Sequence, residues 1–318
     1  MHWVPSAIAL LVAFALDRAF GEPPTRWHPV GWIGRYFGWT GGLIGRQESR
    51  PQSRWLQFCS GALAWWGGAL LVLGAALLLE RASHALGAVP GAVLAGAALK
   101  PMLSWRMLRD EVQGVEQGLG QSVDAGRSRL QRLVSRDVTT LDDAQVREGA
   151  LESLAENLND SVVAPVFWFV LAGLPGAMIY RFANTADAMW GYRGVRAGMD
   201  WTWAGKWAAR TDDVLSWVPA RLTALLLGVA AGGVRFRALC GEARHTPSPN
   251  GGWPMAAMAL ALGVCLRKPG VYELNAGAVA PQPRHTAAAL TLASRSVALL
   301  VTWAVAALLG MAWLQVQR

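Results

Sequence analysis

Residues 59–79 read CSGALAWWGGALLVLGAALLL, an uncharged run of 21 residues. A membrane-spanning α-helix needs about 20 apolar residues to cross a hydrocarbon layer of about 30 Å. The run therefore predicts a transmembrane helix. The whole chain of 318 residues is 53% hydrophobic and only 16% charged, which is too little charge for a fully hydrated surface. The composition favours an integral membrane protein.

Three other segments are candidates for membrane spans. Residues 297–314, VALLVTWAVAALLGMAWL, carry no charge and should cross the membrane. The first 16 residues lack the positive n-region and the small-residue cleavage pattern of a signal peptide, so we expect an uncleaved first helix. Residues 86–99 reach spanning length only if their helix continues through 101–108.

Two further apolar segments contain features that disturb a membrane helix. Residues 161–180 carry two prolines and two glycines, so they either cross the membrane or dip in and return. Only a return would bring the polar residues at 156–160 and at 184–193 together. Residues 214–234 contain Arg221, which should face a polar cavity or a carboxylate because a charge in lipid is costly.

We therefore predict an all-α, polytopic membrane protein with roughly four to six membrane helices, broken or re-entrant segments included. Apolar residues recur at helical spacing among charged ones over 127–157, which predicts amphipathic helices outside the membrane. A cap and turn are expected between them at 137–143. We expect one domain over residues 1–318, with this extramembrane helical insertion at about 109–160.

The net charge of +8 comes from arginines scattered through the loops rather than gathered in one tract. This pattern argues against a nucleic-acid partner and favours anionic lipid head groups. The 17 tryptophans also suit a protein with many membrane interfaces. Trp190, Trp201 and Trp203 could cover a large flat ring, but we expect them to be interfacial anchors.

The densest polar cluster precedes the segment 161–180. Glu152, Glu156 and Asp160 follow one another at one-turn spacing, so their carboxylates could together hold Mg²⁺. Asn157 lies on the same short stretch. An ordinary hydrated helix end is an equally weighted alternative.

A second cluster follows the same segment, in the stretch NTADAMWGYR. Asn184, Asp187 and Arg193 bring an amide, a carboxylate and a guanidinium to a membrane edge beside glycine. These groups indicate a small-ligand or phosphate site. The alternative is a capped helix start, with Asn184 or Thr185 as the cap.

Two more polar stretches lie further along the chain. AARTDDV combines Arg210 with Asp212 and Asp213, which suits either a metal-ligand pair or a salt-bridge network that anchors a helix end. HTPSPNGG contains His245 and Asn250 among prolines and glycines that restrict the backbone, and it suits either a functional loop or a plain turn.

Near the N-terminus, DRAFGEPPTRWHPVGWIGR contains His28. This histidine could carry a proton or bind a ligand, although a lone histidine near tryptophans is more often structural. The sequence contains no Walker loop, no G-x-G-x-x-G and no G-x-S-x-G. A nucleotide site in this chain would therefore have another construction.

Six stretches, in this order, resemble the cobalamin-biosynthesis family CobD/CbiB, the adenosylcobinamide-phosphate synthases. They extend from residue 17 to 275 and read DRAFGEPPTRWHPVGWIGR, ESLAENLNDSVVAPVFW, GLPGAMIYRFANTADAMWGYR, AARTDDVLSWVPARLTA, HTPSPNGGWPMAAMA and KPGVYELN. One departure is Leu-Asn-Asp-Ser at 158–161, where the family pattern reads Thr-Ser-Asp-Gly. The acid at Asp160 is kept.

The resemblance implies an ATP-dependent amide-forming ligase with ATP and Mg²⁺ as cofactors. Its substrates would be adenosylcobyric acid, through a propionate carboxylate, and either aminopropanol or aminopropanol phosphate. The resemblance also implies a multi-pass protein of the cell inner membrane, surrounded by lipid, with a cytoplasmic active site. Association with other membrane enzymes of the cobalamin pathway is a further expectation.

The resemblance lets us assign roles to the polar clusters as a hypothesis. Catalytic roles are assigned to Glu156, Asp160, Asp187 and His245. Metal and nucleotide binding is assigned to the acids Glu156, Asp160, Asp187, Asp212 and Asp213. Phosphate would be neutralised by Arg193, Arg210 and Arg221, and substrates would be oriented by Asn157, Asn184 and Asn250. Either His245 or His28 would accept the proton of the amine.

Two other classes of protein are alternatives. A membrane transporter or channel would also have broken helices and an intramembrane arginine. A structural or signalling subunit would use the polar clusters only to cap helices and bind partners. The chain shows no inverted repeat, and its carboxylates suit metal-nucleotide chemistry better than a pore, so we prefer the enzyme.

Overall fold

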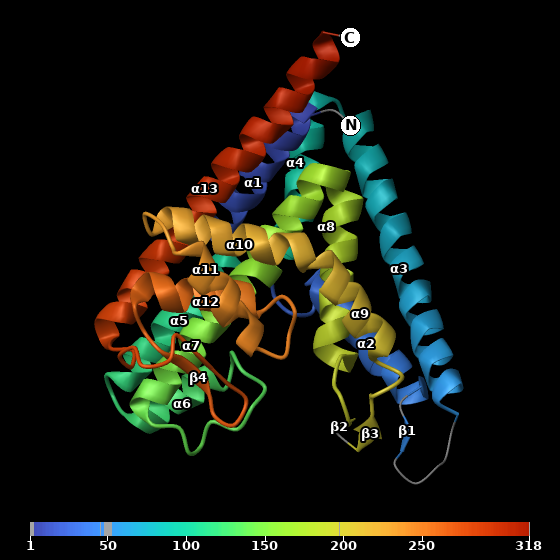
Figure 1. Ribbon diagram of the computed structural model, residues 1–318. Coiled ribbons are helices and arrows are strands. Elements are labelled where there is room, and N and C mark those ends of the chain that lie inside the picture. The colour runs from blue at the N-terminus through green and yellow to red at the C-terminus, as the bar shows by residue number, and fades with distance from the viewer. Residues whose placement is uncertain (1–2, 45, 48–52, 197, 318) are drawn as a thin grey trace. The chain divides into compact units, whose positions relative to one another are not determined.

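The computed structural model describes residues 3–44, 46–47, 53–196 and 198–317, and these residues are mainly helical (Figure 1). The all-α prediction is therefore confirmed. The chain forms two compact units. Unit one comprises Met1–Leu103, Ala164–Leu215 and Ala304–Arg318, and unit two comprises Ser104–Val163 and Ser216–Trp303.

Four helical stretches among the described residues are long and apolar enough to cross a membrane. They are α1 (Trp3–Phe20), α3 (Arg54–Ala85), the stretch Asp143–Trp190 and α13 (Pro283–Val316). A fifth span results if the broken pair of α9 (Lys206–Leu215) and α10 (Trp217–Ala230) is counted as one. This number lies within the predicted range.

The predicted span that starts at residue 86 is wrong. Helix α4 (Ala88–Leu99) has 12 residues and ends in a 3₁₀ turn, η1 (Lys100–Met102). Leu103 is then extended, with φ −109° and ψ 142°. Pro101 lacks the N–H that a continuing α-helix would use, so the chain turns here instead of extending the helix.

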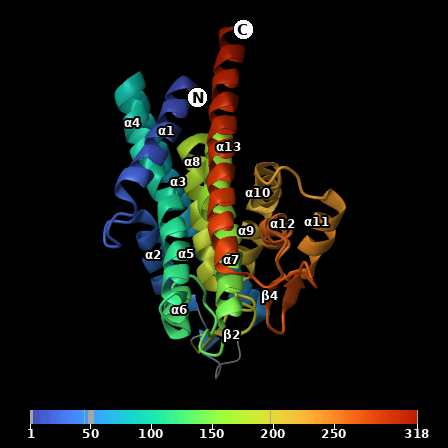
Figure 2. The same cartoon turned by 90° about the vertical axis from the view of Figure 1, so that its left-hand side faces the viewer.

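Unit one is built around the helix α8 (Ala164–Trp190). Helix α2 (Pro29–Ile44), α3 and α9 each pack against α8, and α1 packs along α4 (Figure 2). A small antiparallel sheet has the strand order β1 (Arg46–Gln47), β3 (Met199–Asp200), β2 (Val195–Arg196). In its register Asp200 lies opposite both Arg46 and Val195.

Helix α8 is a hairpin of two helical arms (Figure 1). Gly173 has φ 64° and ψ −155°, a conformation that glycine adopts readily, and Pro175 follows two residues later. A side chain at Gly176 would collide with the carbonyl oxygen of Trp168. In a straight helix, residues eight apart are separated by about 12 Å along the axis. The sequence allowed residues 161–180 either to cross or to turn back, and the described backbone turns back.

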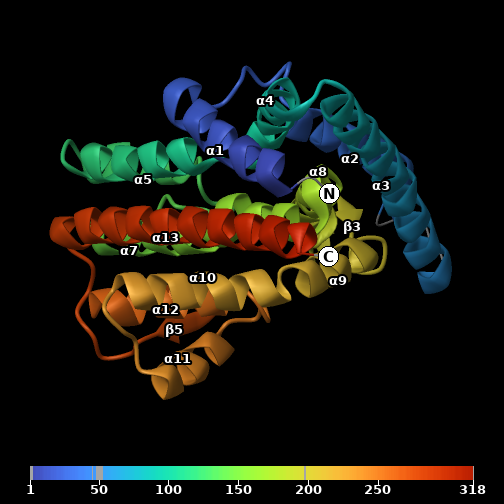
Figure 3. The ribbon, with the colours of Figure 1, turned by 90° about the horizontal axis from the view of Figure 1, so that it is seen from above.

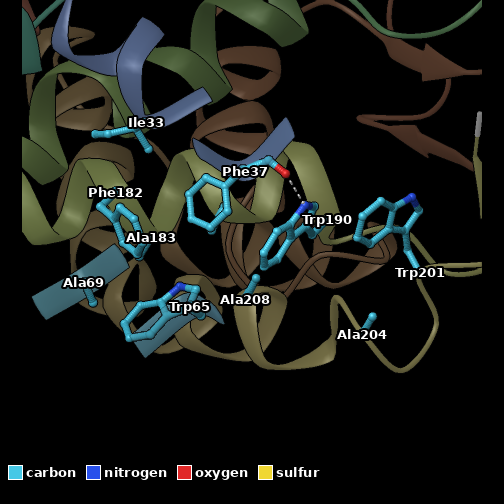
Figure 4. Packing of buried hydrophobic residues seen from close by; sticks show 11 residues of the cluster. Ile33, Phe37, Trp65, Ala69, Phe182, Ala183, Trp190, Trp201, Ala204 and Ala208 are labelled. Atoms are coloured by element: carbon cyan, nitrogen blue, oxygen red, sulfur yellow. Dashed lines mark hydrogen bonds between the residues drawn. The ribbon is translucent and has the colours of Figure 1, made fainter. Parts of the chain in front are cut away.

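Aromatic side chains form the core of unit one (Figure 4). The rings of Trp190 and Trp201 stack at 15° with centroids 5.7 Å apart, and Phe37 meets Trp190 edge to face. Trp190 Nε1 donates to the Phe37 carbonyl oxygen at 3.2 Å, so the indole can be buried without losing its hydrogen bond. Trp190 and Trp201 are 1% and 5% exposed. The prediction that these two are interfacial anchors is therefore wrong.

Unit two begins with three helices that pack together, α5 (Trp105–Leu119), α6 (Val123–Leu130) and α7 (Asp143–Leu158). Asp142 starts α7 with a capping box: its carboxylate accepts from Gln145 N at 2.8 Å, and Gln145 Oε1 accepts from Asp142 N at 2.9 Å. This confirms the predicted cap and turn. The π-helix η2 (Asn159–Val163) follows α7 directly.

The second half of unit two surrounds α12 (Gly252–Leu262), which lies beside α10 (Figure 3). Helix α11 (Phe236–Glu242) and the 3₁₀ turn η3 (Ala243–His245) contact α12. An antiparallel hairpin of β4 (Leu266–Lys268) and β5 (Tyr272–Leu274) packs against α7 through β4. The first residue of the KPGVYELN stretch, Lys268, lies in β4.

Candidate functional site

A buried ionic cluster in unit one holds the predicted residue His28. His28 Nε2 donates to Glu22 Oε2 at 2.8 Å, and Lys100 Nζ lies 2.9 Å from the same oxygen. Lys100 Nζ is also 3.4 Å from Asp17 Oδ1, and the Asp17 side chain is only 2% exposed. The cluster joins the end of α1, the loop that follows it and the turn after α4.

The contacts of this cluster stabilise the ionised form of Glu22. Burial alone would raise the pKa of Glu22, but the hydrogen bonds and charges of His28 and Lys100 outweigh burial and hold the pKa below its ordinary value. His28 Nδ1 accepts from Val30 N at 3.2 Å. Both ring nitrogens of His28 therefore have partners within the protein, which suits an orienting role better than proton transfer.

The predicted residues of α8 and α9 form a polar group in unit one. Asn184 Nδ2 donates to Asp212 Oδ1 at 3.4 Å, while Asn184 Oδ1 accepts from Arg181 at 3.1 Å. The carboxylate of Asp187 folds over Gly191, where any side chain would collide with it. Asn184 and Asp212, which are 28 residues apart, are thus brought together by the packing of α9 on α8.

Charged residues continue this polar group. Asp213 lies within electrostatic reach of both Arg210 and Arg193. Two guanidinium groups near a carboxylate and an Asn–Asp pair can bind a phosphate and the metal ion that accompanies it. Of the predicted residues, this group contains Asn184, Asp187, Arg193, Arg210, Asp212 and Asp213.

In unit two, Arg221 of α10 holds the predicted loop that contains Asn250. Its NH1 donates to Asn250 Oδ1 at 2.7 Å and to the Trp217 carbonyl at 2.8 Å, and its NH2 donates to the Pro249 carbonyl at 3.2 Å. The guanidinium lies 4.4 Å and 4.7 Å from the ring centroids of Trp217 and Trp253. Arg221 therefore bonds to an amide and two backbone carbonyls, and not to a carboxylate, which was one of the two partners expected from the sequence.

Further hydrogen bonds order the same loop. Ser248 Oγ accepts from the backbone N–H groups of Asn250 and Gly251 at 3.2 Å and 3.0 Å. Beside the loop, His245 Nδ1 lies 3.3 Å from Glu242 Oε2, and the His245 side chain is 55% exposed. A Cβ added at Gly251 would lie 3.2 Å from Glu156 Oε1, so the loop approaches the end of α7.

The end of α7 carries the predicted residues Glu156, Asn157 and Asp160. Glu156 is exposed, and Asn157 Nδ2 donates to the Ser153 carbonyl at 2.9 Å. Asp160 lies in the π-helix η2, where its Oδ1 accepts from Asn159 at 2.8 Å. A π-helical turn shifts the helix face by one residue, and such turns occur often at functional sites.

Glu152, one turn before Glu156, has a different environment because it is buried. Its Oε2 accepts from Arg136 NH2 at 3.0 Å. Glu152 and Arg136 line a cavity of about 150 Å³ together with eight other residues. The other lining residues are Leu133, Val134, Ser135, Ser153, Glu156, Asn157, Lys268 and Tyr272. Burial and the charge of Glu152 raise the pKa of Tyr272.

Among the described residues, no three His, Cys, Asp or Glu side chains meet as a group that could hold a metal ion. Mg²⁺ that arrives with a nucleotide needs only one or two carboxylates, because phosphate oxygens and water complete its coordination. The oxygen donors of Asp212 and Asp213, next to Arg210, fit that limited role. The magnesium assignments to these acids and to Glu156 and Asp160 stay predictions.

Comparison with known proteins identifies the family. The family described as CobD/Cbib protein matches residues 10–300. The chain belongs to this family. The matched range contains the positions of all the predicted site residues, which lie between His28 and Asn250.

Relatives of the CobD/CbiB chain come from archaea and bacteria. The probable cobalamin biosynthesis protein CobD of Methanothermobacter thermautotrophicus is 40% identical over 273 residues, which cover 84% of this chain and 86% of the relative. The probable cobalamin biosynthesis protein CobD of Thermococcus kodakarensis is 41% identical over 266 residues, which cover 84% of this chain and 84% of the relative. The cobalamin biosynthesis protein CobD of Rhodobacter capsulatus is 36% identical over 312 residues, 92% of this chain and 94% of the relative. No solved structure matches the chain.

Sequence reasoning missed three residues around the cavity in this CobD/CbiB protein. Lys268 and Tyr272 lie in KPGVYELN, one of the six stretches that carry the resemblance, but neither was singled out. Arg136 carries no local signal, because it lies in an irregular loop 16 residues before its partner Glu152. Glu152 itself was placed in the acidic cluster that could hold Mg²⁺ but was not among the residues assigned to the site.

Proposed function

We propose that this CobD/CbiB protein forms an amide bond between a propionate carboxylate of adenosylcobyric acid and aminopropanol or its phosphate, with hydrolysis of ATP. The observation that carries the proposal is the family match over residues 10–300. The names of the relatives place them in cobalamin biosynthesis. They refer to biosynthesis rather than transport, and no observation favours the transporter alternative.

The polar group of unit one supports the nucleotide part of this proposal. Bound Mg-ATP would supply the activation of the carboxylate that amide formation requires. Arg193 and Arg210 would neutralise phosphate charge, and Asp212 and Asp213 would hold the metal ion. Asn184 would keep Asp212 oriented through the hydrogen bond between them.

Glu156 and Asp160, the acids at the end of α7, would be the catalytic and metal-binding acids of unit two. Glu156 is exposed and can reach a ligand without an accompanying change in the helix. Asp160 is held by Asn159 Nδ2, and the side-chain oxygen Oδ1 of Asn159 in turn accepts from the Thr223 hydroxyl of α10 at 3.1 Å. Asn157 and Asn250 would orient substrates, and Arg221 would act on Asn250 by fixing its position.

His245 suits proton transfer from the amine better than His28 does. When His245 Nδ1–H donates to Glu242 Oε2, the lone pair of Nε2 points away from that contact. A neutral histidine oriented by a carboxylate in this way is a usual general base. His28 uses both ring nitrogens within its own cluster.

The protein would act in the cell inner membrane with its active site on the cytoplasmic side. Its apolar helices fit a membrane protein, and ATP and corrinoid precursors are cytoplasmic molecules. Association with other membrane enzymes of the pathway would shorten the path of the corrinoid between them.

Substitutions in the purified, detergent-solubilised full chain test the proposal. Asp187→Asn and Asp212→Asn should each lower ATP-dependent amide formation at least a hundredfold, because each removes a charge proposed to face metal and phosphate. Asp124→Asn is a matched control, since the Asp124 side chain is 87% exposed on α6. Full activity in both site variants would overturn the assignment. Flux across sealed vesicles without ATP cleavage would instead support a transporter.

A further inference from the structure

Helix α10 of unit two has an outward face of large apolar side chains. Its inner side packs on α12. Trp217, Val218, Leu225 and Val229 lie on the outside, and each of them is between 44% and 61% exposed. The last three are spaced by seven and four residues, so they share one face of the helix. A row of this kind marks a surface that contacts another apolar phase.

The charges around this face have a single sign. Residues 214–241 contain no Asp, Glu or Lys, and their only charged side chains are Arg221, Arg235 and Arg237. The guanidinium of Arg221 is already bonded to the loop 246–251 and stacked on two tryptophan rings. Arg235 and Arg237 are exposed on either side of Phe236, which is itself 71% exposed. Exposed apolar side chains beside cations, with no anion among them, suit the surface of an anionic bilayer.

The length and direction of α10 indicate how it meets the bilayer. Its 14 residues extend about 21 Å, which is less than the hydrocarbon thickness of about 30 Å. The first part of α13 belongs to the same unit, and α13 is long and apolar enough to span. Helix α10 is seen side-on in Figure 1 and end-on in Figure 2, whereas α13 is seen side-on in both, so α10 crosses the direction of α13. A helix that crosses a spanning helix in this way lies closer to the membrane plane.

The outward face of α10 also points to the correct side. In Figure 1, α10 lies on the side of α12 toward which α13 continues, so its outward face is turned to the bilayer that α13 enters. After α10, Gly232 and Gly233 have φ angles of 82° and 125°, a backbone that glycine adopts readily and that turns the chain into α11. Phe236 at the start of α11 then continues the exposed apolar surface.

We propose that α10 and the start of α11 lie in the surface of an anionic phospholipid membrane. The outward face of α10 and the Phe236 ring enter the acyl chains just below the head groups, and Arg235 and Arg237 contact the lipid phosphates. Helix α10 is then an in-plane anchor and not half of a fifth span. Because Arg221 of α10 holds the loop 246–251, this anchor keeps that loop beside the membrane surface.

Spin labels on the full chain in lipid nanodiscs measure the depth of α10. Single cysteines are introduced by Val218→Cys and Val229→Cys in a chain whose three native cysteines are replaced by alanine. These positions are eleven residues apart, about 16 Å along a helix. Collisions with oxygen and with a neutral nickel chelate should place both labels at the same depth, just below the phosphates. Labels at Leu299 and Leu309 of α13, about 15 Å apart along the helix, are the matched control and should differ in depth.

Other depths would overturn the proposal. A difference between the two α10 labels like that between the two α13 labels would show that α10 crosses the bilayer. Labels on α10 that meet the chelate as freely as a label in water would show that the face is hydrated. Labels that neither oxygen nor the chelate reaches would show that another protein surface covers it.

A label introduced by Phe236→Cys tests the contact with anionic head groups. In nanodiscs that contain phosphatidylglycerol it should be sheltered from the chelate, and in phosphatidylcholine alone its accessibility should rise roughly twofold or more. Arg235→Gln combined with Arg237→Gln should cause the same rise in the anionic nanodiscs. Arg284→Gln, at the start of α13, removes an exposed arginine far from the apolar run and is the matched control. Equal accessibility in both lipids and in all variants would overturn the assignment of the two arginines to lipid phosphates.

Discussion

The contacts of Arg221 predict that Arg221→Lys loosens the loop 246–251 without removing the positive charge. Arginine makes two hydrogen bonds to this loop, to Asn250 Oδ1 and to the Pro249 carbonyl. A lysine keeps the charge but cannot make the planar, two-sided contact between the Trp217 and Trp253 rings. A hydrogen bond from a charged donor contributes about 1.5–3 kcal/mol, and partial exposure places the loss near the lower end, at about 2 kcal/mol.

Hydrogen exchange measures this loss directly. The amides of Asn250 and Gly251 are protected by Ser248 Oγ, and a loss of about 2 kcal/mol in the free energy of opening should speed their exchange about 30-fold. Arg237→Lys, on the exposed surface of α11, should leave both rates unchanged. If Arg221→Lys also leaves the two amides unchanged, Arg221 does not position this loop, and its main role must lie elsewhere.

Three further substitutions should change the free energy of unfolding, measured by denaturant titration in detergent. Glu22→Gln should cost about 3 kcal/mol at pH 7, because it breaks a largely buried ionic cluster. The pKa of Glu22 is lowered in the folded state, so the ionised Glu22 stabilises the protein fully above the unfolded pKa near 4.5. This stabilisation declines as the pH falls through the lower folded-state pKa, and the difference in stability between Glu22→Gln and the unaltered chain should therefore shrink in acid. A difference that does not depend on pH would contradict this. Asp142→Ala should cost about 1 kcal/mol through loss of the capping box, and an unchanged midpoint would show that the box is not stabilising. Gly173→Ala should cost about 1–2 kcal/mol because its φ of 64° is unfavourable for a side chain, whereas equal stability would mean that the α8 hairpin tolerates another backbone.

Uncharged runs of spanning length were enough to predict two of the long apolar helices. The uncharged run at 59–79 lies inside α3, and the run at 297–314 lies inside α13. The cap before α7 could also be predicted, because it depends on residues only three apart. For the α8 segment the sequence allowed either a crossing or a return, since its prolines and glycines permit a break but do not show where the chain turns.

Predictions that depend on tertiary packing were less successful. Trp190 and Trp201 stack inside unit one because a carbonyl of α2 satisfies the Trp190 N–H, and no local pattern indicates that partner. The contact between Asn184 and Asp212 requires α9 to pack on α8. The pair of Arg136 and Glu152 depends on how an irregular loop folds against α7. Helical spacing alone therefore grouped Glu152 with Glu156 and Asp160 and could not indicate its buried contact with Arg136.

The central claim is that this CobD/CbiB protein is an ATP-dependent amide ligase. Its most direct test is mass analysis of corrinoid products after the purified full chain is incubated in lipid with adenosylcobyric acid, Mg-ATP and aminopropanol or aminopropanol phosphate. We predict a corrinoid whose mass has increased by that of the amine less one water, formed only when ATP is present. Unchanged adenosylcobyric acid with both amines, in protein shown to be folded, would contradict the account.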